Sequence, residues 1–285
     1  MNAPMKDVAA ITMLRNDDWF LRRWVKYYAA QLGRENLYIL FDGKDQRVPD
    51  FCEGCNTLVC DKLPGKVVEM DRRRAALVSE TANALRNTYR CVIATDVDEF
   101  LVLDPLCGDS LKDYLLRWHR EHPGHISVSG LGVDVGENTR TEQPIDDSKT
   151  FLSQRSCGFL LSRYTKPVAT FAPCRWGGGY HRVKGHNFHI SPDLYLFHFG
   201  CVDVSRIKAK AISADISSLG AQRHIKKRLR TSTICSTKRV RDWDRACAYR
   251  RFMQTLLRQP FQLNKPSTGI AKIVVRIPER FSTIV

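Results

Sequence analysis

The chain has no long apolar run. None of its 285 residues belongs to a stretch that approaches the roughly 20 apolar residues of a membrane-spanning helix. The first ten residues are too polar, and too short of an apolar segment, for a secretory signal. Internal repeats and low-complexity tracts are also missing. We therefore expect a soluble, cytoplasmic protein with one large domain or two small ones.

A closed set of zinc ligands is missing as well. Cys52, Cys55 and Cys60 have part of a zinc spacing, but no second pair of Cys or His follows at the distance that a four-ligand site needs. The ten cysteines are scattered, and several adjoin apolar, strand-like runs in which free thiols pack well. We expect reduced cysteines in place of disulfides or structural zinc.

Acidic residues are scarce in one part of the chain. The net charge is +15, and residues 205–258 contain fifteen Lys or Arg against three Asp, whereas the rest is nearly balanced. The densest basic run covers residues 223–230, and Trp243, Tyr249 and Phe252 interleave with the basic residues that follow. Such a segment suits anionic lipid headgroups, an acidic glycan or nucleic acid, and its alternative is a solvated helical surface.

The spacing of apolar residues predicts strands that alternate with helices. This order indicates an α/β fold with a mostly parallel, twisted, Rossmann-like sheet flanked by helices, in which ligands bind beyond the carboxyl ends of the strands. We expect a nucleotide-binding and catalytic domain over residues 1–204 and a basic, mainly helical C-terminal segment over 205–285. The expected strands cover residues 8–14, 37–41, 57–60, 91–94, 125–129 and 194–199, and the expected helices cover 18–33, 68–87, 111–119 and parts of 205–259.

Acidic residues follow three of these strands. Asp17, Asp42 and the pair Asp96 and Asp98 all fall at carboxyl ends, which a parallel sheet brings to one edge. The two-residue period of a strand puts Asp96 and Asp98 on one side of the chain and Glu99 on the other. Such an oxygen-rich edge suits Mg²⁺ or Mn²⁺ with positions left open for the phosphates of a nucleoside diphosphate. The alternative is an acidic turn after a buried strand.

Four short segments of the first hundred residues carry a family resemblance. They are Leu14-Arg15-Asn16-Asp17, the helix with Trp24 and Tyr27-Tyr28 that leads to Leu32-Gly33, the strand end Phe41-Asp42-Gly43, and Asp96-Val97-Asp98-Glu99-Phe100. Through them the chain resembles the family 2-like glycosyltransferases of the GT-A fold. The D-x-D-E-F segment is the specific part, and the resemblance extends more loosely to about residue 210.

The resemblance implies transfer of a sugar from a nucleotide-sugar donor, with uridine diphosphate as the expected carrier. In such enzymes Mn²⁺ or Mg²⁺ bridges the diphosphate and the D-x-D segment. The family places Asp42 near the base or ribose, with Arg15 and Asn16 beside it. It places Asp96 near the ribose and the metal, and Asp98 on the metal.

A histidine late in the fold often completes the metal site in this family, and His198 has the matching position. His181, His186 and His189 compete with it for this role. Arg74, in the run Arg72-Arg73-Arg74, is a candidate phosphate contact because a guanidinium can donate two parallel hydrogen bonds to phosphate oxygens. The alternative is that this run lies on an exposed face of a helix.

Inversion at the sugar, which the resemblance favours, requires a carboxylate that takes the proton of the acceptor hydroxyl. Asp134 is our candidate because its surroundings are the most strand-like. The other candidates are Glu137, Glu142, Asp146 and Asp147. The chain lacks the Glu-Asp pair that many family members carry at the acceptor site, so the stereochemistry stays open.

Three rival functions start from the same residues. A nucleotidyltransferase would use a related sheet, and a haloacid dehalogenase-type phosphatase would use the first Asp of D-x-D as a nucleophile. The third is a non-enzymatic binder of polyanions or membrane surfaces through the basic segment. For a glycosyltransferase the acceptor would be a glycan, a lipid-linked molecule or a protein. Peripheral contact with the anionic inner face of a membrane stays open, and nucleic acid is not the partner we expect.

Overall fold

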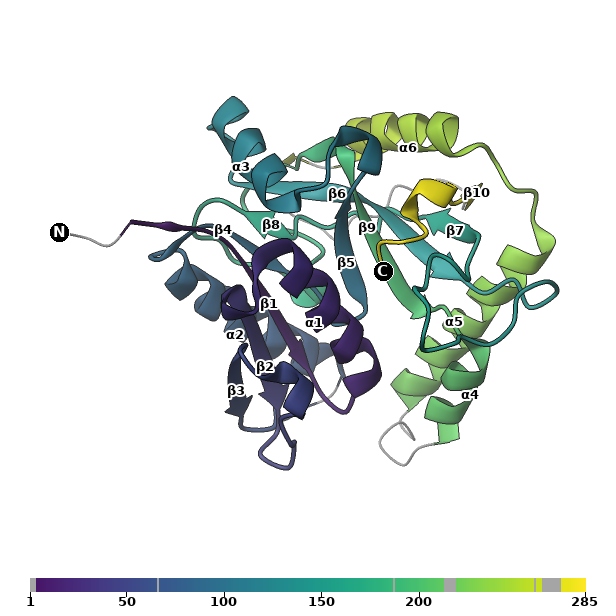
Figure 1. Ribbon diagram of the computed structural model, residues 1–285, viewed down its shortest axis with the longest axis horizontal. Coiled ribbons are helices and arrows are strands. Elements are labelled where there is room, and N and C mark those ends of the chain that lie inside the picture. Colours follow the sequence, from purple (N-terminus) through teal and green to yellow (C-terminus); the bar gives the residue numbers. More distant parts are fainter. Residues whose placement is uncertain (1–3, 66, 187, 213–218, 259, 263–272) are drawn as a thin grey trace.

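The structure, a computed structural model, describes residues 4–65, 67–186, 188–212, 219–258, 260–262 and 273–285. These residues form one sheet of ten strands with helices against it (Figure 1). The strands are β1 (Lys6–Leu14), β2 (Leu37–Asp42), β3 (Asn56–Cys60), β4 (Tyr89–Ala94), β5 (Glu99–Leu103), β6 (Ser127–Gly136), β7 (Cys157–Leu160), β8 (Ala169–Thr170), β9 (Ile190–Cys201) and β10 (Ile273–Arg276). The α-helices are α1 (Asp18–Leu32), α2 (Val67–Leu85), α3 (Leu111–Glu121), α4 (Val204–Ile212), α5 (Leu219–Thr237) and α6 (Trp243–Leu257).

The N-terminal half of the sheet is parallel, in the order β3-β2-β1-β4. Alternate residues of β1 face opposite layers: Ala10 packs with α1 and α3, whereas Ile11 and Met13 pack with α2. Because helices cover both faces, these strands read as almost continuous apolar runs. The six strands and three helices predicted up to residue 200 are confirmed, apart from their ends.

The C-terminal half of the sheet is mixed. β8 lies antiparallel between β4 and β6, while β9 is parallel to β6 and antiparallel to β5. The mostly parallel sheet that we predicted is therefore confirmed for β3, β2, β1 and β4, and β6 and β9 form one further parallel pair within the mixed half. The strand predicted over 125–129 continues to Gly136, because Gly130 and Gly132 interrupt its apolar pattern. A Cβ atom at either glycine would collide with the backbone of a neighbouring segment, near Tyr195 or Tyr164.

Residues beyond 204 share the core of the sheet. Their helices α4, α5 and α6 confirm the helical prediction in the part that the structure describes, and β10 pairs with β7. The rings of Trp243 and Phe281 pack on Tyr195 of β9, with centroids 4.9 and 5.5 Å away. The side chains of Arg223 and Lys227 lie outside the described part.

All ten cysteines are free thiols in the structure. Among the described helices, none combines the length and the apolar character needed to cross a membrane.

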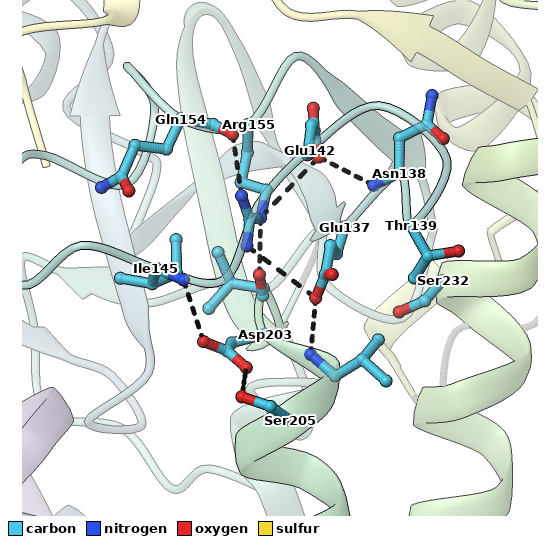
Figure 2. Close-up of polar contacts among 12 residues, drawn as sticks. Glu137, Asn138, Thr139, Glu142, Ile145, Gln154, Arg155, Asp203, Ser205 and Ser232 are labelled. Carbon is cyan, nitrogen blue, oxygen red and sulfur yellow. Dashed lines mark hydrogen bonds and ion pairs between the residues drawn. The ribbon is translucent and has the colours of Figure 1, made fainter.

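A buried arginine ties together the ends of β6 and β9 (Figure 2). The Nε–H of Arg155 donates to the carbonyl of Val202 at 2.6 Å, and its guanidinium lies 3.8 Å from carboxylate oxygens of Glu137 and Glu142. Glu137 also accepts the N–H of Val204, at the start of α4, at 2.6 Å. A buried guanidinium is stable only when carboxylates and carbonyl groups pair with it. This network therefore fixes the positions of β6, β9 and α4 relative to one another.

The aromatic face of α1 holds β5, whose sheet neighbour is β9. The hydroxyl of Tyr28 accepts the N–H of Leu101 at 2.9 Å, and the hydroxyl of Tyr27 donates to the carbonyl of Leu101 at 2.7 Å. The indole N–H of Trp24 donates to the Thr95 hydroxyl, just before the acidic segment, at 3.0 Å. The two tyrosines therefore satisfy backbone groups on the side of β5 that faces away from β9.

We predict that Tyr28→Phe lowers the free energy of unfolding by about 1–3 kcal/mol, because it leaves the buried N–H of Leu101 without an acceptor. Urea denaturation measures the change. Tyr249→Phe is the matched control: its ring is 48% exposed, and we expect a change within about 0.5 kcal/mol. Equal effects of the two substitutions would contradict the assigned role of the Tyr28 hydroxyl.

Candidate functional site

The acidic segment between β4 and β5 is a turn. The N–H of Glu99 donates to the carbonyl of Asp96 at 3.0 Å, which closes it. The N–H of Thr95 donates to β1 at 3.2 Å, and the carbonyl of Asp98 accepts the N–H of Phe199 in β9 at 2.9 Å. The turn is thus anchored to the parallel strands on one side and to β9 on the other.

Lys166 brings two carboxylates of the turn together. Its Nζ lies 2.9 Å from Asp96 Oδ2 and 2.5 Å from Glu99 Oε1. The prediction that Glu99 points away from Asp96 is wrong, because the chain turns between them and the two-residue period of a strand does not apply. Arg74 NH2 lies 3.1 Å from the other oxygen of Asp96. The lysine and arginine come from loop and helix segments that the sequence separates widely from the turn.

Burial and charge compete at these groups. Burial raises the pKa of Asp96, but Lys166 and Arg74 outweigh it and bring the pKa to about 2. Burial raises the pKa of Glu99 to about 7, although Lys166 acts in the opposite direction. For Lys166 burial lowers the pKa, but the two carboxylates raise it above its ordinary value. The ammonium is therefore held in its charged form inside the protein.

The second group of site residues is centred on His198, which contacts Asp98 and Asp134. His198 of β9 stands opposite Glu99 of β5 and opposite Asp134 of β6 in the registers of the two strand pairs. Its Nε2 lies 3.3 Å from Asp98 Oδ2 and its Nδ1 lies 2.7 Å from Asp134 Oδ1. The ring of Tyr164 stacks on the imidazole at 3.9 Å. His198 and Asp134 are both buried.

The two aspartates determine the charge of His198. Burial lowers its pKa, but Asp98 and Asp134 outweigh burial and raise the pKa to about 10. Burial raises the pKa of Asp98, yet His198 and Arg228 bring it far below its ordinary range. The imidazole is consequently an imidazolium that pairs with both carboxylates.

Arg228 of α5 is a site residue that the sequence analysis missed. Its NH2 lies 3.4 Å from Asp98 Oδ2. In the sequence it belongs to the basic run 223–230, which we interpreted as a surface, and no local pattern separates it from its neighbours. Only the packing of α5 beside β9 brings it to a carboxylate 130 positions earlier.

The other predicted donor-binding residues gather at the carboxyl ends of β1 and β2. Arg15 NH1 donates to the carbonyl of Asp42 at 2.7 Å and pairs with Asp45 through both of its terminal nitrogens. Asp42 Oδ1 accepts the N–H of Leu63 at 2.7 Å, and Asn16 exchanges hydrogen bonds with the side chain of Gln46. These residues therefore share the sheet edge with the acidic turn.

The competing histidines lie elsewhere. His181 Nδ1 is 2.8 Å from the carbonyl of Arg163, and His186 is exposed. The ring of His189 stacks on His125 with centroids 3.4 Å apart. His198 is thus the candidate that the structure brings to the D-x-D turn.

Asp98 and His198 would fit a Mg²⁺ or Mn²⁺ ion as a pair of neighbouring ligands once the ion displaces the proton from His198 Nε2, because only a neutral imidazole binds a metal. Adjacent ligands of an octahedral ion at about 2.1 Å lie roughly 3 Å apart, close to the 3.3 Å between Asp98 Oδ2 and His198 Nε2. The bond from Nδ1 to Asp134 aims Nε2 at Asp98, as a carboxylate behind a metal-binding histidine does. Among the described residues no group of three or more His, Cys, Asp or Glu could hold a metal. Further ligands would have to come from water or substrate.

Two pockets lie beside the sheet. The first, of about 150 Å³, adjoins the D-x-D turn through Arg228, and the apolar side chains of Trp19, Phe20, Phe199 and Ile207 also line it. The other, of about 470 Å³, lies where β1 and β4 begin and is lined by Arg86, Arg90, His119 and Arg120, among others. It contains none of the predicted site residues.

Acidic and basic side chains are paired throughout the site. The carboxyl groups of Asp96, Asp98, Glu99 and Asp134 contact the cationic groups of Arg74, Lys166, His198 and Arg228, and Arg74 also lies 3.2 Å from Asp71. A polyanion and a divalent cation that neutralise each other could enter such a site without changing its net charge. The arrangement can therefore hold a cation between two donors and place guanidinium groups beside its anionic partner.

Comparison with known proteins leaves the family open: no family model matches the chain, and a search of curated proteins gives no significant match.

We predict that Lys166→Met lowers the free energy of unfolding by about 3–5 kcal/mol, because Asp96 and Glu99 then lose their shared buried cation. Adding Glu99→Gln should recover a large part of this loss, since it removes the carboxylate that has lost its cation, whereas Asp96 keeps Arg74 at 3.1 Å. Urea denaturation of the wild type, both single variants and the double variant gives the coupling energy. Strictly additive effects would contradict the bridging role of Lys166.

Proposed function

We propose that the chain is a metal-dependent glycosyltransferase with a GT-A-like fold, which transfers a sugar from a nucleotide-sugar donor. The observation that carries the proposal is the position of Asp98, in the turn just before β5, beside His198 of β9, with Asp134 of β6 on the other side of the imidazole. A carboxylate and an imidazole that face each other at the spacing of cis ligands, with a second carboxylate behind the imidazole, support a cation site in which the metal ion takes the place of the proton on Nε2.

In this proposal Asp98 and His198 hold Mn²⁺ or Mg²⁺, whereas Asp96, the third ligand that the resemblance implied, is paired with Lys166 and Arg74. The bound ion would neutralise charge that develops on the diphosphate leaving group. Arg228 lies on the Asp98 side of the site and Arg74 on the Asp96 side. We assign both guanidinium groups to the phosphates of the donor, which would replace their present carboxylate partners.

The nucleoside would lie along the ends of β1 and β2. Asp42 is the ribose or base contact in this arrangement, and Arg15 and Asn16 shape the same edge through their bonds to the 42–46 turn. Ligands of parallel sheets bind in this region, where the carboxyl ends of adjacent strands meet. Uridine remains the base that we propose, from the resemblance alone.

We assign Asp134 a positioning role in place of the base role that the sequence suggested. Its carboxylate is buried and accepts a hydrogen bond from His198 Nδ1, so it is directed at the imidazole. The apolar pocket beside Arg228 is the space that we propose for the acceptor, because it adjoins the Asp98 side of the site. It offers little polar surface, which suits an acceptor with an apolar part.

A thermal-shift panel of nucleotide-sugars with and without Mn²⁺ tests this function. We predict that one donor, at about a hundredfold above its dissociation constant, stabilises the protein by roughly 2.7 kcal/mol, and that this gain requires Mn²⁺. Asp98→Asn should lose the part of the gain that depends on Mn²⁺. Asp113→Asn, at an exposed position of α3, should keep it.

The products then separate the two transferase reactions. A glycosyltransferase releases the nucleoside diphosphate from the donor, whereas a nucleotidyltransferase makes the nucleotide-sugar from a nucleoside triphosphate and a sugar phosphate. Stabilisation by every nucleotide without regard to Mn²⁺, and unchanged in Asp98→Asn, would refute the proposal.

A further inference from the structure

Helix α6 is fixed to the protein by one face. Trp243 packs among the aromatic rings of the core, and Arg250 NH2 donates to the carbonyl of Leu160 at 2.7 Å. At the end of the helix Arg258 NH2 donates to the carbonyls of Ser162 and Thr165. The opposite face of α6 must therefore point outward, and Figure 1 shows the helix at the edge of the molecule.

That outward face is apolar and aromatic along three turns. Tyr249, Phe252 and Leu256 are spaced by three and four residues, so they form one stripe. They are 48%, 66% and 66% exposed. Large apolar side chains that stand together on a surface usually mark a site of contact with a partner or a membrane.

Cationic side chains precede the stripe. Lys238, Arg239, Arg241 and Arg245 are exposed, and none of them forms an ion pair within the part of the chain that the structure describes. Arg245 continues the spacing of the stripe by one further step of four residues, and Arg241 lies just before the helix, in a β-bridge with Val275. Two carboxylates lie nearby: Asp242 caps the first turn of α6, and Asp244, whose side chain is largely exposed, lies 3.7 Å from Arg280.

We propose that these seven side chains form a docking surface for an anionic lipid bilayer. The α6 surface consists of Lys238, Arg239, Arg241, Arg245, Tyr249, Phe252 and Leu256. A helix that lies in the membrane interface has this composition, with an aromatic and aliphatic face immersed at the level of the headgroups and basic residues beside it. The cations attract anionic headgroups and the stripe adds contact that salt does not screen.

Charge argues against a second copy of the chain as the occupant. In a symmetric dimer the same patch of both copies meets itself. The four cations of the α6 surface would then approach the four of the partner, and like charges across an interface are strongly unfavourable. A bilayer with anionic headgroups supplies the opposite charge and an apolar layer at once.

Cosedimentation of the full chain with vesicles tests the proposal without reference to enzymatic activity. Binding should be strong to phosphatidylcholine vesicles that contain about 30% phosphatidylglycerol, weak to pure phosphatidylcholine, and reduced by salt. Arg241→Gln with Arg245→Gln should lower the partition coefficient about thirtyfold at low ionic strength. Phe252→Ser with Leu256→Ser should lower it at least about tenfold and leave a remainder that salt abolishes.

Two matched variants control for total charge and apolarity. Lys26→Gln with Arg120→Gln removes two exposed cations from α1 and α3, and Leu58→Ser with Leu106→Ser removes two exposed leucines. We expect both to bind within about threefold of the wild type.

Three results would overturn the proposal. They are absence of binding to the anionic vesicles, equal losses in the control and α6-surface variants, and tighter binding to polyglutamate than to the vesicles. A dimer in sedimentation velocity that Phe252→Ser abolishes would assign the face to a second copy instead.

Discussion

The buried ammonium of Lys166 is the interaction on which the rest of the site depends. It touches Asp96 and Glu99, which the chain places at the two ends of a tight turn. A buried ion costs several kcal/mol in lost hydration, and only partners of opposite charge repay that loss. Without Lys166 the carboxylates of this turn would repel one another, and the turn would not present Asp98 to His198 in its present form.

The other charged side chains of the site also stabilise one another by pairing with groups of opposite charge. His198 is charged because Asp98 and Asp134 flank it, and Arg228 adds a further cation beside Asp98. The protein therefore balances its acidic turn from four separate segments: α2, the loop before β8, β9 and α5. Residues after position 204 take part in this balance, which makes α5 a part of the site as well as a carrier of basic charge. The glycosyltransferase proposal uses this balanced cluster as a place where a cation and a diphosphate replace internal partners.

Sequence periodicity predicted the N-terminal half of the fold well, because both faces of the β1–β4 sheet are covered and its helices have clear apolar faces. His198 was predicted only from the family resemblance, because a single histidine in an apolar strand has no local sequence pattern of its own. Periodicity failed for Glu99, because the chain turns between Asp96 and Glu99 and the two-residue period of a strand does not apply there. It failed for β6, where glycines demanded by close packing interrupt the apolar pattern.

The site residues that came from distant helices or loops had no sequence signal of their own. Lys166 lies in a loop, and Arg228 is one of many basic residues in α5. Their roles follow from tertiary contacts 70 and 130 positions away in the chain. The exposed stripe on α6 is different: its spacing and the basic residues before it are legible in the sequence, but only the buried Trp243 and Arg250 reveal which face points outward.

Anomalous diffraction from a crystal that contains Mn²⁺ and uridine diphosphate tests the central claim most directly. The account predicts a manganese peak between Asp98 Oδ2 and His198 Nε2, with diphosphate oxygens in the remaining coordination positions and Arg228 turned toward a phosphate. A peak elsewhere, with the Asp98 carboxylate still paired to His198 and Arg228 and no nucleotide at the sheet edge, would contradict it.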